Sequence, residues 1–368
     1  MKAKMGKLLF VDLGRASFEE RAVPDDWYEA WLGGAGIGIR ALYDEVPAGA
    51  DALGPANVLG FMSGLLTGTG SVVTGRWTAL AKSPLTGGIG DSNCGGDLSI
   101  AIKQCGYDGI FFRGVSAAPV TFVLDPKGPR LEDATALWGR DAIETEEALR
   151  AAWRGAKRPA IATIGPAAEK LSLIAGISND GGRYAGRSGL GAVMGSKRLK
   201  ALVLVGMKQV PVADPERVKA LSKDYAAKVK RQRLPPVLLG RFLPLLGRLL
   251  GGKTVVPTDG LLSVAVLKKW GTNANSMIGA VNGDAPIRNW GGSVADFPHR
   301  KYKGLDPDGI RARETRKYHC YSCAIGCGAI CDISDLVPGR GHSHKPEYET
   351  ATVFGGLVLS GEDRKSVV

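Results

Sequence analysis

Residues 74–96 read Thr74-Gly-Arg-Trp-Thr-Ala-Leu-Ala-Lys-Ser-Pro-Leu-Thr-Gly-Gly-Ile-Gly-Asp-Ser-Asn-Cys-Gly-Gly96, and this stretch shows the pattern of the N-terminal half. A short apolar run, Trp77–Lys82, is followed by a proline and several glycines, as is typical of a strand that ends in turns. The pattern recurs from Lys7 to Gly206. Because strands outnumber helices and do not alternate regularly with them, we predict an α+β sheet domain and not a doubly wound one.

Local patterns predict the individual elements. The apolar runs predict strands at Lys7–Leu13, Phe18–Val23, Val58–Met62, Trp77–Lys82, Gly109–Arg113, Val120–Leu124, Ala160–Ile164, Ser172–Ala175 and Lys200–Val205. Helical periodicity predicts helices at Trp27–Leu32, Ile37–Tyr43, Leu98–Gln104, Ala142–Trp153 and Leu190–Leu199. Near Val210 the sequence Asp214-Pro215-Glu216 gives a cap residue, a first-turn proline and a first-turn acid. We therefore expect one domain over 1–210 and a second, mostly helical domain over 211–368, which opens with a helix from Pro215 to about Arg233.

The composition indicates a folded protein with a basic surface. Of 368 residues, 44% are hydrophobic and 23% charged, and 52 are glycines, about twice the usual share. The net charge of +12 favours anionic partners, whether cofactors, membrane headgroups or acidic proteins. No helix-turn-helix, zinc-finger or aromatic RNA-binding motif accompanies the charge, so we do not expect nucleic acid to be a partner.

The N-terminus does not resemble a signal peptide. The apolar run Leu8–Val11 is too short for a signal peptide, so we expect a cytoplasmic protein. The hydrophobic segment 234–256 contains prolines, glycines and two arginines, so we do not expect a transmembrane helix. It is either a buried or partner-covered insertion, or a contact with a membrane surface or another subunit. Residues 362–365 read as a helix start just before Val368, so we expect the second domain to be cut short.

The cysteines give the sharpest chemical indication. Cys320, Cys323 and Cys327 form a C-x2-C-x3-C run, and Cys331 follows four residues later. Thiolates spaced so closely can enclose one soft metal centre, and iron–sulfur clusters are held by such runs. A zinc site that uses His319 is an alternative, although no second cysteine pair is present, and buried thiols are another. A disulfide knot would suit a secreted chain better.

Glycine and arginine occur together in two stretches. Residues 60–96 contain ten glycines and residues 165–195 contain eight, with Arg76, Arg183 and Arg187 among them. Glycine lets backbone groups approach a polar ligand, and arginine pairs with phosphate. The alternative is that the glycines make turns and the arginines face solvent. Of the two isolated cysteines, Cys105 fits a core position, whereas Cys94 lies in a glycine-rich loop where its thiol could face a ligand.

Two further motifs bear on function. The glycine patterns at 34–38 and 189–195 have the wrong spacing for a dinucleotide fingerprint, which disfavours nicotinamide binding. Glu347 and Glu349 lie about twenty residues after the cysteine run. A carboxylate beside a buried redox centre can serve as general acid or base, but such a pair also occurs at the start of a helix.

Taken together, the motifs resemble the tungsten-containing aldehyde:ferredoxin oxidoreductase family. The resemblance runs from Gly6 to about Gly356 and is densest in Thr74–Thr86, Asp91–Gly96, Ile177–Lys197, and Cys320–Cys327 with Glu347–Glu349. It implies a first domain of two β-sheets that form a saddle-like base for a tungsten (or molybdenum) bis-pterin cofactor, with helical domains beyond it. It also implies a [4Fe–4S] cluster, Mg²⁺ bridging the pterin phosphates, an aldehyde substrate, ferredoxin as electron acceptor, and a homo-oligomer or complex subunit.

The resemblance assigns roles residue by residue. Cys320, Cys323 and Cys327 match three cluster ligands, Glu349 matches a glutamate that handles the proton, and Arg76 matches an arginine between cluster and pterin. Asn93 and Tyr184 match positions whose carbonyls hold the magnesium. The remaining cofactor contacts expected in the same stretches are Gly95, Gly96, Arg183, Gly186 and Arg187.

Some family features are missing from this chain, and the rival functions follow from that. The resemblance implies that the fourth cluster cysteine, a catalytic histidine and further pterin-binding motifs normally lie in a C-terminal region of the family beyond the part that this chain matches, so a C-terminal partner chain is one way to complete the site. Cys331 is an alternative source of the fourth thiolate. The rival functions are the tungsten subunit of an aromatic acyl-CoA (benzoyl-CoA) reductase, a truncated non-catalytic fragment, and a zinc-stabilised binding protein.

Overall fold

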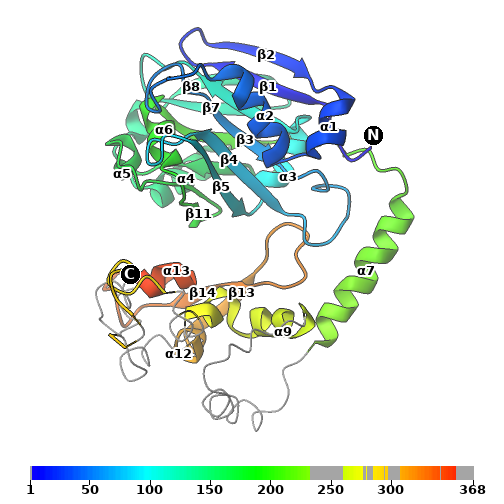
Figure 1. The fold of residues 1–368 in the computed structure, drawn as a ribbon, viewed down its shortest axis with the longest axis vertical. Coiled ribbons are helices and arrows are strands. Elements are labelled where there is room, and N and C mark those ends of the chain that lie inside the picture. The colour runs from blue at the N-terminus through cyan, green and yellow to red at the C-terminus, as the bar shows by residue number, and fades with distance from the viewer. Residues whose placement is uncertain are drawn as a thin grey trace. The chain divides into compact units, whose positions relative to one another are not determined.

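A computed structural model of the protein describes residues 2–232, 260–276, 279, 285–293, 295–296, 307–339 and 341–353. The chain divides into two compact units (Figure 1). The first contains Met1–Ser222 together with Cys320–Cys323, and the second contains Lys223–His319 and Ala324–Val368. The hydrophobic segment 234–256 and the helix start expected at 362–365 lie outside the described residues.

The first unit contains two six-stranded mixed sheets. The first sheet has the order β2-β1-β6-β3-β4-β5, and only its β1–β6 pair is parallel. Its strands are β1 (Lys7–Asp12), β2 (Ser17–Ala22), β3 (Leu59–Ser63), β4 (Arg76–Lys82), β5 (Ile89–Gly95) and β6 (Gly109–Arg113). The second sheet has the order β11-β10-β9-β12-β7-β8. Its strands are β7 (Val120–Asp125), β8 (Gly128–Asp133), β9 (Ala160–Thr163), β10 (Ile177–Asn179), β11 (Arg183–Ala185) and β12 (Leu199–Leu204).

Helices cover these sheets because the strands carry apolar residues on both faces. The helices of the unit are α1 (Asp25–Trp31), α2 (Ala35–Glu45), α3 (Leu98–Cys105), α4 (Ala142–Ala152), α5 (Pro166–Glu169) and α6 (Leu190–Ser196), with a 3-10 turn η1 (Thr135–Leu137). In β1, Leu9 joins a core shared by both sheets, α3 and α6, whereas Phe10 packs beneath α1 and α2. Val123 of β7 packs towards Leu149 of α4. The two-residue period of a strand produces this layering.

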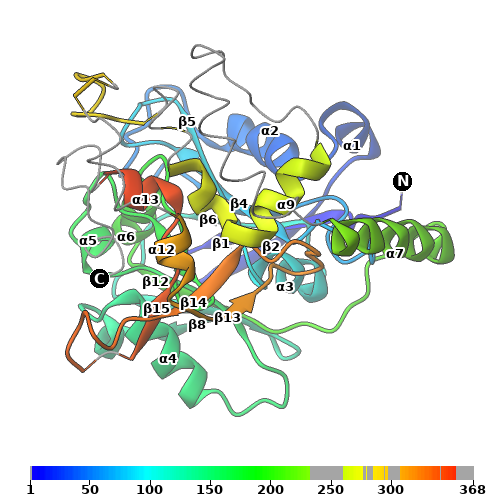
Figure 2. The ribbon, with the colours of Figure 1, turned by 90° about the horizontal axis from the view of Figure 1, so that it is seen from below.

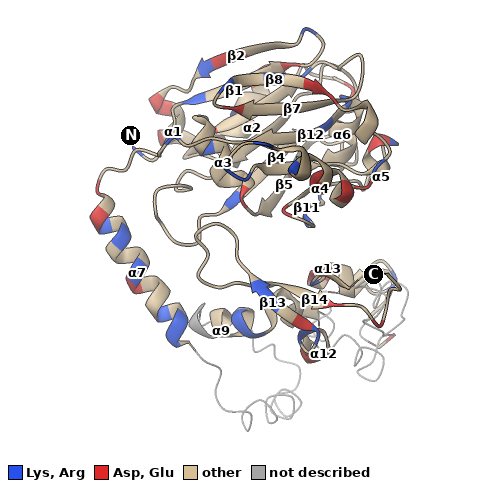
Figure 3. Ribbon diagram, turned by 180° about the vertical axis from the view of Figure 1, so that it is seen from behind, with Lys and Arg blue, Asp and Glu red and all other residues tan. Residues whose placement is uncertain are grey.

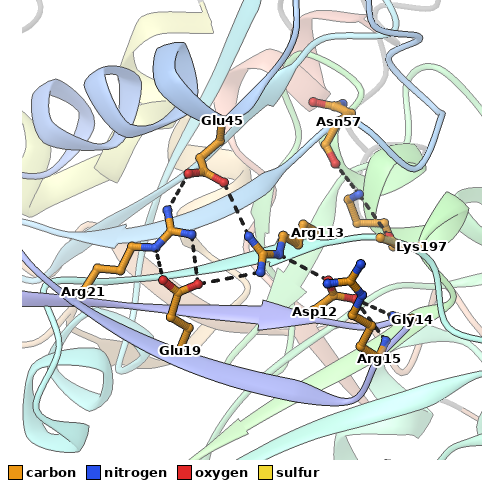
Figure 4. Close-up of polar contacts among 10 residues, drawn as sticks. Asp12, Gly14, Arg15, Glu19, Arg21, Glu45, Asn57, Arg113 and Lys197 are labelled. Carbon is orange, nitrogen blue, oxygen red and sulfur yellow. Dashed lines mark hydrogen bonds and ion pairs between the residues drawn. The ribbon is translucent and has the colours of Figure 1, made fainter.

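A network of charges joins four elements of the first sheet region (Figure 4). Arg21 of β2 contacts Glu19 at 2.6 Å and also Glu45 of α2. Arg113 of β6 lies 3.3 Å from Asp12 of β1, 3.6 Å from Glu19 and 3.8 Å from Glu45. Since two cations alternate with three carboxylates, every member of the network has a partner of opposite charge. Exposure to solvent limits what each pair contributes to stability.

The second unit combines short helices with a small sheet (Figure 2). Its antiparallel strands β13 (Glu314–Tyr318), β14 (Gly328–Asp332) and β15 (His342–His344) follow in that order. The described helices after α7 (Pro215–Arg231) are α9 (Gly260–Trp270), α12 (Pro307–Arg311) and α13 (Tyr348–Thr352), with a 3-10 turn η2 (Gly271–Asn273). The cysteine run follows β13 and ends immediately before β14.

The predicted fold class and most predicted elements are confirmed. The corrections are local. The strand predicted at Ser172–Ala175 is wrong, because those residues form turns and the strand β10 begins at Ile177. The helix predicted to reach Leu199 ends at Ser196, and Leu199 opens β12 instead. The Cys94 loop is part of strand β5, and the small sheet of the second unit is an addition to the helices expected there.

Candidate functional site

The edge of the first sheet carries the first group of predicted site residues. In the β4–β5 ladder, Arg76 is opposite Gly95 and Thr78 is opposite Asn93. Arg76 donates through Nε to Asn93 Oδ1, and through Nη2 to the Asn93 carbonyl at 3.1 Å. Asn93 Nδ2 donates in turn to Thr78 Oγ1 at 2.9 Å. The arginine is therefore held along β5 by an amide, and its side chain remains exposed to solvent.

The edge of the second sheet lies beside the edge strand β5. The backbone N–H of Arg187, just after β11, donates to Ser92 Oγ at 3.0 Å, and Ser188 Oγ donates to the Asp91 carbonyl at 3.1 Å. Tyr184 is 53% exposed, and its hydroxyl accepts from the Gly176 N–H at 3.0 Å. The two glycine-rich stretches that are far apart in the sequence thus form one continuous edge, visible where β5 and β11 meet in Figure 1.

The first cysteine of the run reaches this same edge. Arg183 at the start of β11 donates through Nη1 to Cys320 Sγ at 2.9 Å. A Cβ atom on Gly95 would lie 2.4 Å from that sulfur and 3.1 Å from Arg183 Nη1, so only glycine leaves room for the thiol. The structure therefore brings together Gly95, Arg183 and Cys320.

The short segment Cys320–Cys323 is fixed to the first unit by its backbone. The Val73 N–H donates to the Ser322 carbonyl at 2.7 Å, and Ser322 Oγ donates to the Ser71 carbonyl at 2.8 Å. A Cβ on Gly75 would lie 2.1 Å from the Tyr321 carbonyl oxygen. The glycine before Arg76 is needed for this close approach, which the sequence did not indicate.

Behind the edge, a carboxylate that sequence reasoning missed organises the turn between β10 and β11. Asp180 Oδ2 accepts from the Asp97 N–H at 2.6 Å and from Asn179 Nδ2 at 3.2 Å. Gly96, at φ +120°, leaves room for it, since a Cβ there would lie 2.1 Å from Asp180 Oδ2. Burial, with the neighbouring charge of Asp97, raises the pKa of Asp180 to about 6. The indication available in the sequence was the Asn-Asp-Gly-Gly turn itself.

The six cysteines fall into two groups by environment. Cys94, Cys105 and Cys331 are packed into sheet or helix cores, and burial raises the pKa of their thiols to about 12, about 12 and about 11. Cys94 donates to Asn179 Oδ1 at 3.2 Å, so its thiol faces the core and not a ligand. Cys331 is fully buried in β14.

The three cysteines of the run are half-buried and none is in a disulfide. They are Cys320, Cys323 and Cys327. The Cys323 N–H donates to the Cys320 carbonyl at 3.1 Å and closes a tight turn between the first two. Among the described residues, no three His, Cys, Asp or Glu side chains converge on one point. A shared metal site therefore rests on the C-x2-C-x3-C spacing.

Glu347 and Glu349 take the positions of a helix start. Glu347 is the residue before α13, and its side chain accepts from Thr272 Oγ1. Glu349 lies in the first turn of α13 and is exposed. Both belong to the second unit, whereas Cys320 and Cys323 belong to the first. The two glutamates therefore occupy the start of a helix, which was the alternative interpretation of this pair. The proton-handling role of Glu349 stays a prediction.

The sequence profile of the N-terminal domain of aldehyde ferredoxin oxidoreductase matches residues 8–206, and that of domains 2 and 3 matches residues 258–366. The chain belongs to this family. The predicted resemblance is confirmed. Tungsten-containing aldehyde ferredoxin oxidoreductases of Pyrococcus furiosus and Thermococcus kodakarensis are each 33% identical to it over 96% of its length, and the chain covers 53% of each.

Two other similar proteins carry different names. One is the WOR-like subunit of an aliphatic sulfonate oxidoreductase of Pyrococcus furiosus, 29% identical, of which the chain covers 55%. The other is the active-site complex BamBC of benzoyl coenzyme A reductase, solved with 1,5-dienoyl-CoA; it is 28% identical with a TM-score of 0.74, over 99% of this chain and 52% of that one. The chain thus spans about half the length of these relatives. None of the described helices is long and apolar enough to cross a membrane.

Proposed function

We propose that this member of the aldehyde ferredoxin oxidoreductase family works as an oxidoreductase on aldehydes. In this proposal a tungsten bis-pterin centre lies on the β5–β11 edge and a [4Fe–4S] cluster is bound by Cys320, Cys323 and Cys327. The observation that carries the proposal is the contact of Arg183 Nη1 with Cys320 Sγ at 2.9 Å. The sulfur packs against Gly95, where a Cβ atom would lie 2.4 Å from it.

The residues present fit both groups. The thiols of the run are half-buried and not in disulfides, which suits cluster ligands, and the N–H donor of Arg183 would strengthen a thiolate ligand. Gly95 and Gly96 leave room for Cys320 and Asp180 behind the edge, and Arg76 presents an exposed side chain beside them. Glycine backbone together with arginine is suited to phosphate groups of a pterin cofactor.

When bound, the tungsten centre supplies two-electron oxidation of an aldehyde with water and the cluster supplies one-electron transfer to ferredoxin. Arg76 and Arg183 would orient the cofactor and neutralise its negative charge. Glu349 would hold or deliver the proton that accompanies oxidation. We leave magnesium out of this proposal; the Asn93 carbonyl expected to bind it accepts one hydrogen bond, from Arg76 Nη2 at 3.1 Å.

The test is metal analysis followed by a substrate assay. Protein purified anaerobically from cells supplied with tungstate and molybdate should contain tungsten or molybdenum and about four iron atoms per chain. Aldehyde-dependent reduction of a viologen dye by that protein would support the function. Stoichiometric zinc without iron would contradict it and favour a zinc-stabilised binding protein.

A second candidate function is reduction of an aromatic acyl-CoA. It is favoured by the similarity to the benzoyl coenzyme A reductase complex. The two candidates differ in the direction of electron flow, so one experiment separates them. The metal-loaded protein is given either an aldehyde with an oxidised dye or benzoyl-CoA with a strong reductant. Cyclic diene formation without aldehyde oxidation would replace the first candidate by the second.

A further inference from the structure

A basic cavity opens in the second unit, away from the groups used so far. Its volume is about 570 Å³, and it is lined by Lys268, Lys269, Asp308, Arg311, Ala312, Glu314 and Lys317. Four cations face two carboxylates, which leaves two excess positive charges. Figure 3 shows the corresponding blue segments on α9, α12 and β13. We call this set of residues the basic pocket.

The lysines of the basic pocket are held in place by the protein itself. Lys268 Nζ donates to the Val229 carbonyl at 2.7 Å and to the Gln232 carbonyl at 3.3 Å, at the end of α7. Lys317 Nζ donates to the Lys268 carbonyl. Lys269 Nζ lies 4.0 Å from the centre of the Trp270 ring. Because these side chains are already ordered, a partner that binds them loses little of their conformational entropy.

Each carboxylate of the basic pocket has a partner outside the pocket. Glu314 forms an ion pair at 2.8 Å with Lys345, a nearly buried residue that does not line the cavity. Asp308 accepts from Trp270 Nε1 at 2.6 Å and also lies 3.7 Å from Arg311 Nη1 within the pocket. Burial lowers the pKa of Lys317, and the charges of Lys345 and Arg311 lower it further, while Glu314 acts in the opposite sense. Four cations against two carboxylates leave the pocket positively charged, so it would attract an anionic partner.

The basic pocket adjoins the last cysteine of the run. In the β13–β14 ladder Lys317 is opposite Ala329 and Tyr318 is opposite Gly328, so Cys327 continues from that end of the ladder. A Cβ on Gly271, directly after α9, would lie 2.3 Å from the Cys327 carbonyl oxygen. Strand β13, which contributes Lys317, and the turn that follows Lys268 and Lys269 of α9 thus both lie beside the backbone near Cys327.

We propose that the basic pocket docks a small acidic iron–sulfur protein that accepts electrons at Cys327. This inference rests on the proposed function, because it assumes that Cys327 is a cluster ligand. In each encounter one electron passes from the reduced cluster to the oxidised carrier, and no bond forms or breaks. Complementary charge would raise the encounter rate and fix the orientation of the carrier. A small free anion would satisfy the charge, but it gives no reason for the position beside Cys327.

The test is a binding titration with charge-reversed variants. The chain, loaded anaerobically with iron and sulfide, is titrated with a small acidic ferredoxin by calorimetry at about 0.02 M and about 0.3 M salt. We use Lys269→Glu with Arg311→Glu, and the milder pair Lys269→Gln with Arg311→Gln, since neither side chain holds α7. The matched control is Lys219→Glu, which makes the same type of charge change on a lysine that is 77% exposed in α7.

We expect the reversed pair to weaken ferredoxin binding at least about tenfold at low salt and to flatten its salt dependence. The neutral pair should have an intermediate effect, and the control should stay within about twofold. Iron content and circular dichroism verify that each variant is folded and loaded. Electron transfer from the dithionite-reduced chain should slow in the same order, whereas reduction of a small viologen should not change.

Each other outcome has a defined meaning. If the wild-type chain binds no iron, the proposed function fails and the electron transfer fails with it. If the chain is loaded but does not bind ferredoxin, or the reversed pair binds it as tightly as the wild type, the docking inference alone is overturned. The same holds if the reversed pair loses binding to a short DNA duplex while ferredoxin binding is unchanged, since the pocket would then be a nucleic-acid contact.

Discussion

The cysteine run differs in its environment from the two cysteines that are buried in strands, Cys94 of β5 and Cys331 of β14. Cys94 and Cys331 are 5% and 0% exposed, and burial raises the pKa of their thiols to about 12 and about 11. Cys320 is half-buried and receives a hydrogen bond from the Arg183 guanidinium. A thiolate is the form that binds metal, so burial disfavours metal binding by Cys94 and Cys331.

This difference shows that cysteine count alone does not define the site. Cys331 lies only four residues from Cys327, yet it is a core residue of β14. Cys94 lies within a predicted cofactor stretch, yet its thiol donates to Asn179 in the core. Substitutions in the run and in the core should therefore have different consequences for metal binding and for stability.

The largest expected effect is loss of iron from a variant of the run. Cys320→Ser should reduce iron in the reconstituted chain from about four atoms to less than about one. Cys94→Ser is the matched control; it should retain the iron and should instead lower thermal stability. The measurement is iron and acid-labile sulfide per chain. Equal loss of iron from both variants would remove the distinction between the two groups.

Steric room at Gly95 is the next test. Gly95→Ala places a methyl group 2.4 Å from the Cys320 sulfur and should displace that thiol, which lowers cluster yield several-fold. Because a short side chain can shift, folding stability should fall by no more than about 1–2 kcal/mol. Gly88→Ala is the control, since the Cβ atom that it adds would approach Thr86 Oγ1 no closer than 3.9 Å. Urea unfolding and iron content separate the two effects. An unchanged cluster yield in the first variant would contradict the assigned contact.

The hydrogen bond from Arg183 should tune the cluster. Arg183→Gln removes a positive charge 2.9 Å from Cys320 Sγ, so the oxidised, less negative form of the cluster is favoured. The reduction potential should fall by on the order of 60 mV, equivalent to about 1.4 kcal/mol for one electron. Arg183→Lys should recover part of the shift. A potentiometric titration that gives the same potential for all three proteins would argue against the hydrogen bond.

The last prediction concerns the pH dependence that Asp180, behind the edge, gives to folding stability. Since the pKa of Asp180 is raised to about 6 from an ordinary value of 3.8, the folded state retains a proton between these values that the unfolded state has released. The free energy of unfolding should therefore fall as pH rises from about 4 to about 6, by about 2–3 kcal/mol. Asp180→Asn should lack this decrease, which urea unfolding at several pH values would show. If the free energy of unfolding fell equally with pH in the wild type and in the variant, Asp180 would not be the group responsible.

Sequence patterns predicted the apolar elements well because their burial leaves a local period. Gly109–Arg113 was predicted to the residue, and α3 to within one residue. The strand β5 was missed because its inward positions are small residues, Gly90, Ser92 and Cys94, and not apolar ones. Ser172–Ala175 has apolar residues but forms turns, so composition misled there.

The site was predictable as a set of residues but not as a geometry. Glycine, arginine and cysteine motifs identified Gly95, Arg183 and Cys320 separately. The Arg183–Cys320 contact joins positions 137 residues apart, and no local pattern encodes such a pairing. Asp180 was missed for the same reason, because its partners Gly96 and Asp97 belong to the loop that follows the other sheet's edge strand.

In this interpretation the run at 320–327, and not the core thiols, binds an iron–sulfur cluster. Electron paramagnetic resonance of the anaerobically reconstituted wild-type chain decides the matter, alongside the triple variant of Cys320, Cys323 and Cys327 to Ser. We predict the signal of a reduced [4Fe–4S] cluster in the wild type and none in the triple variant. A colourless, signal-free wild type, or a signal that persists in the triple variant, would refute this assignment.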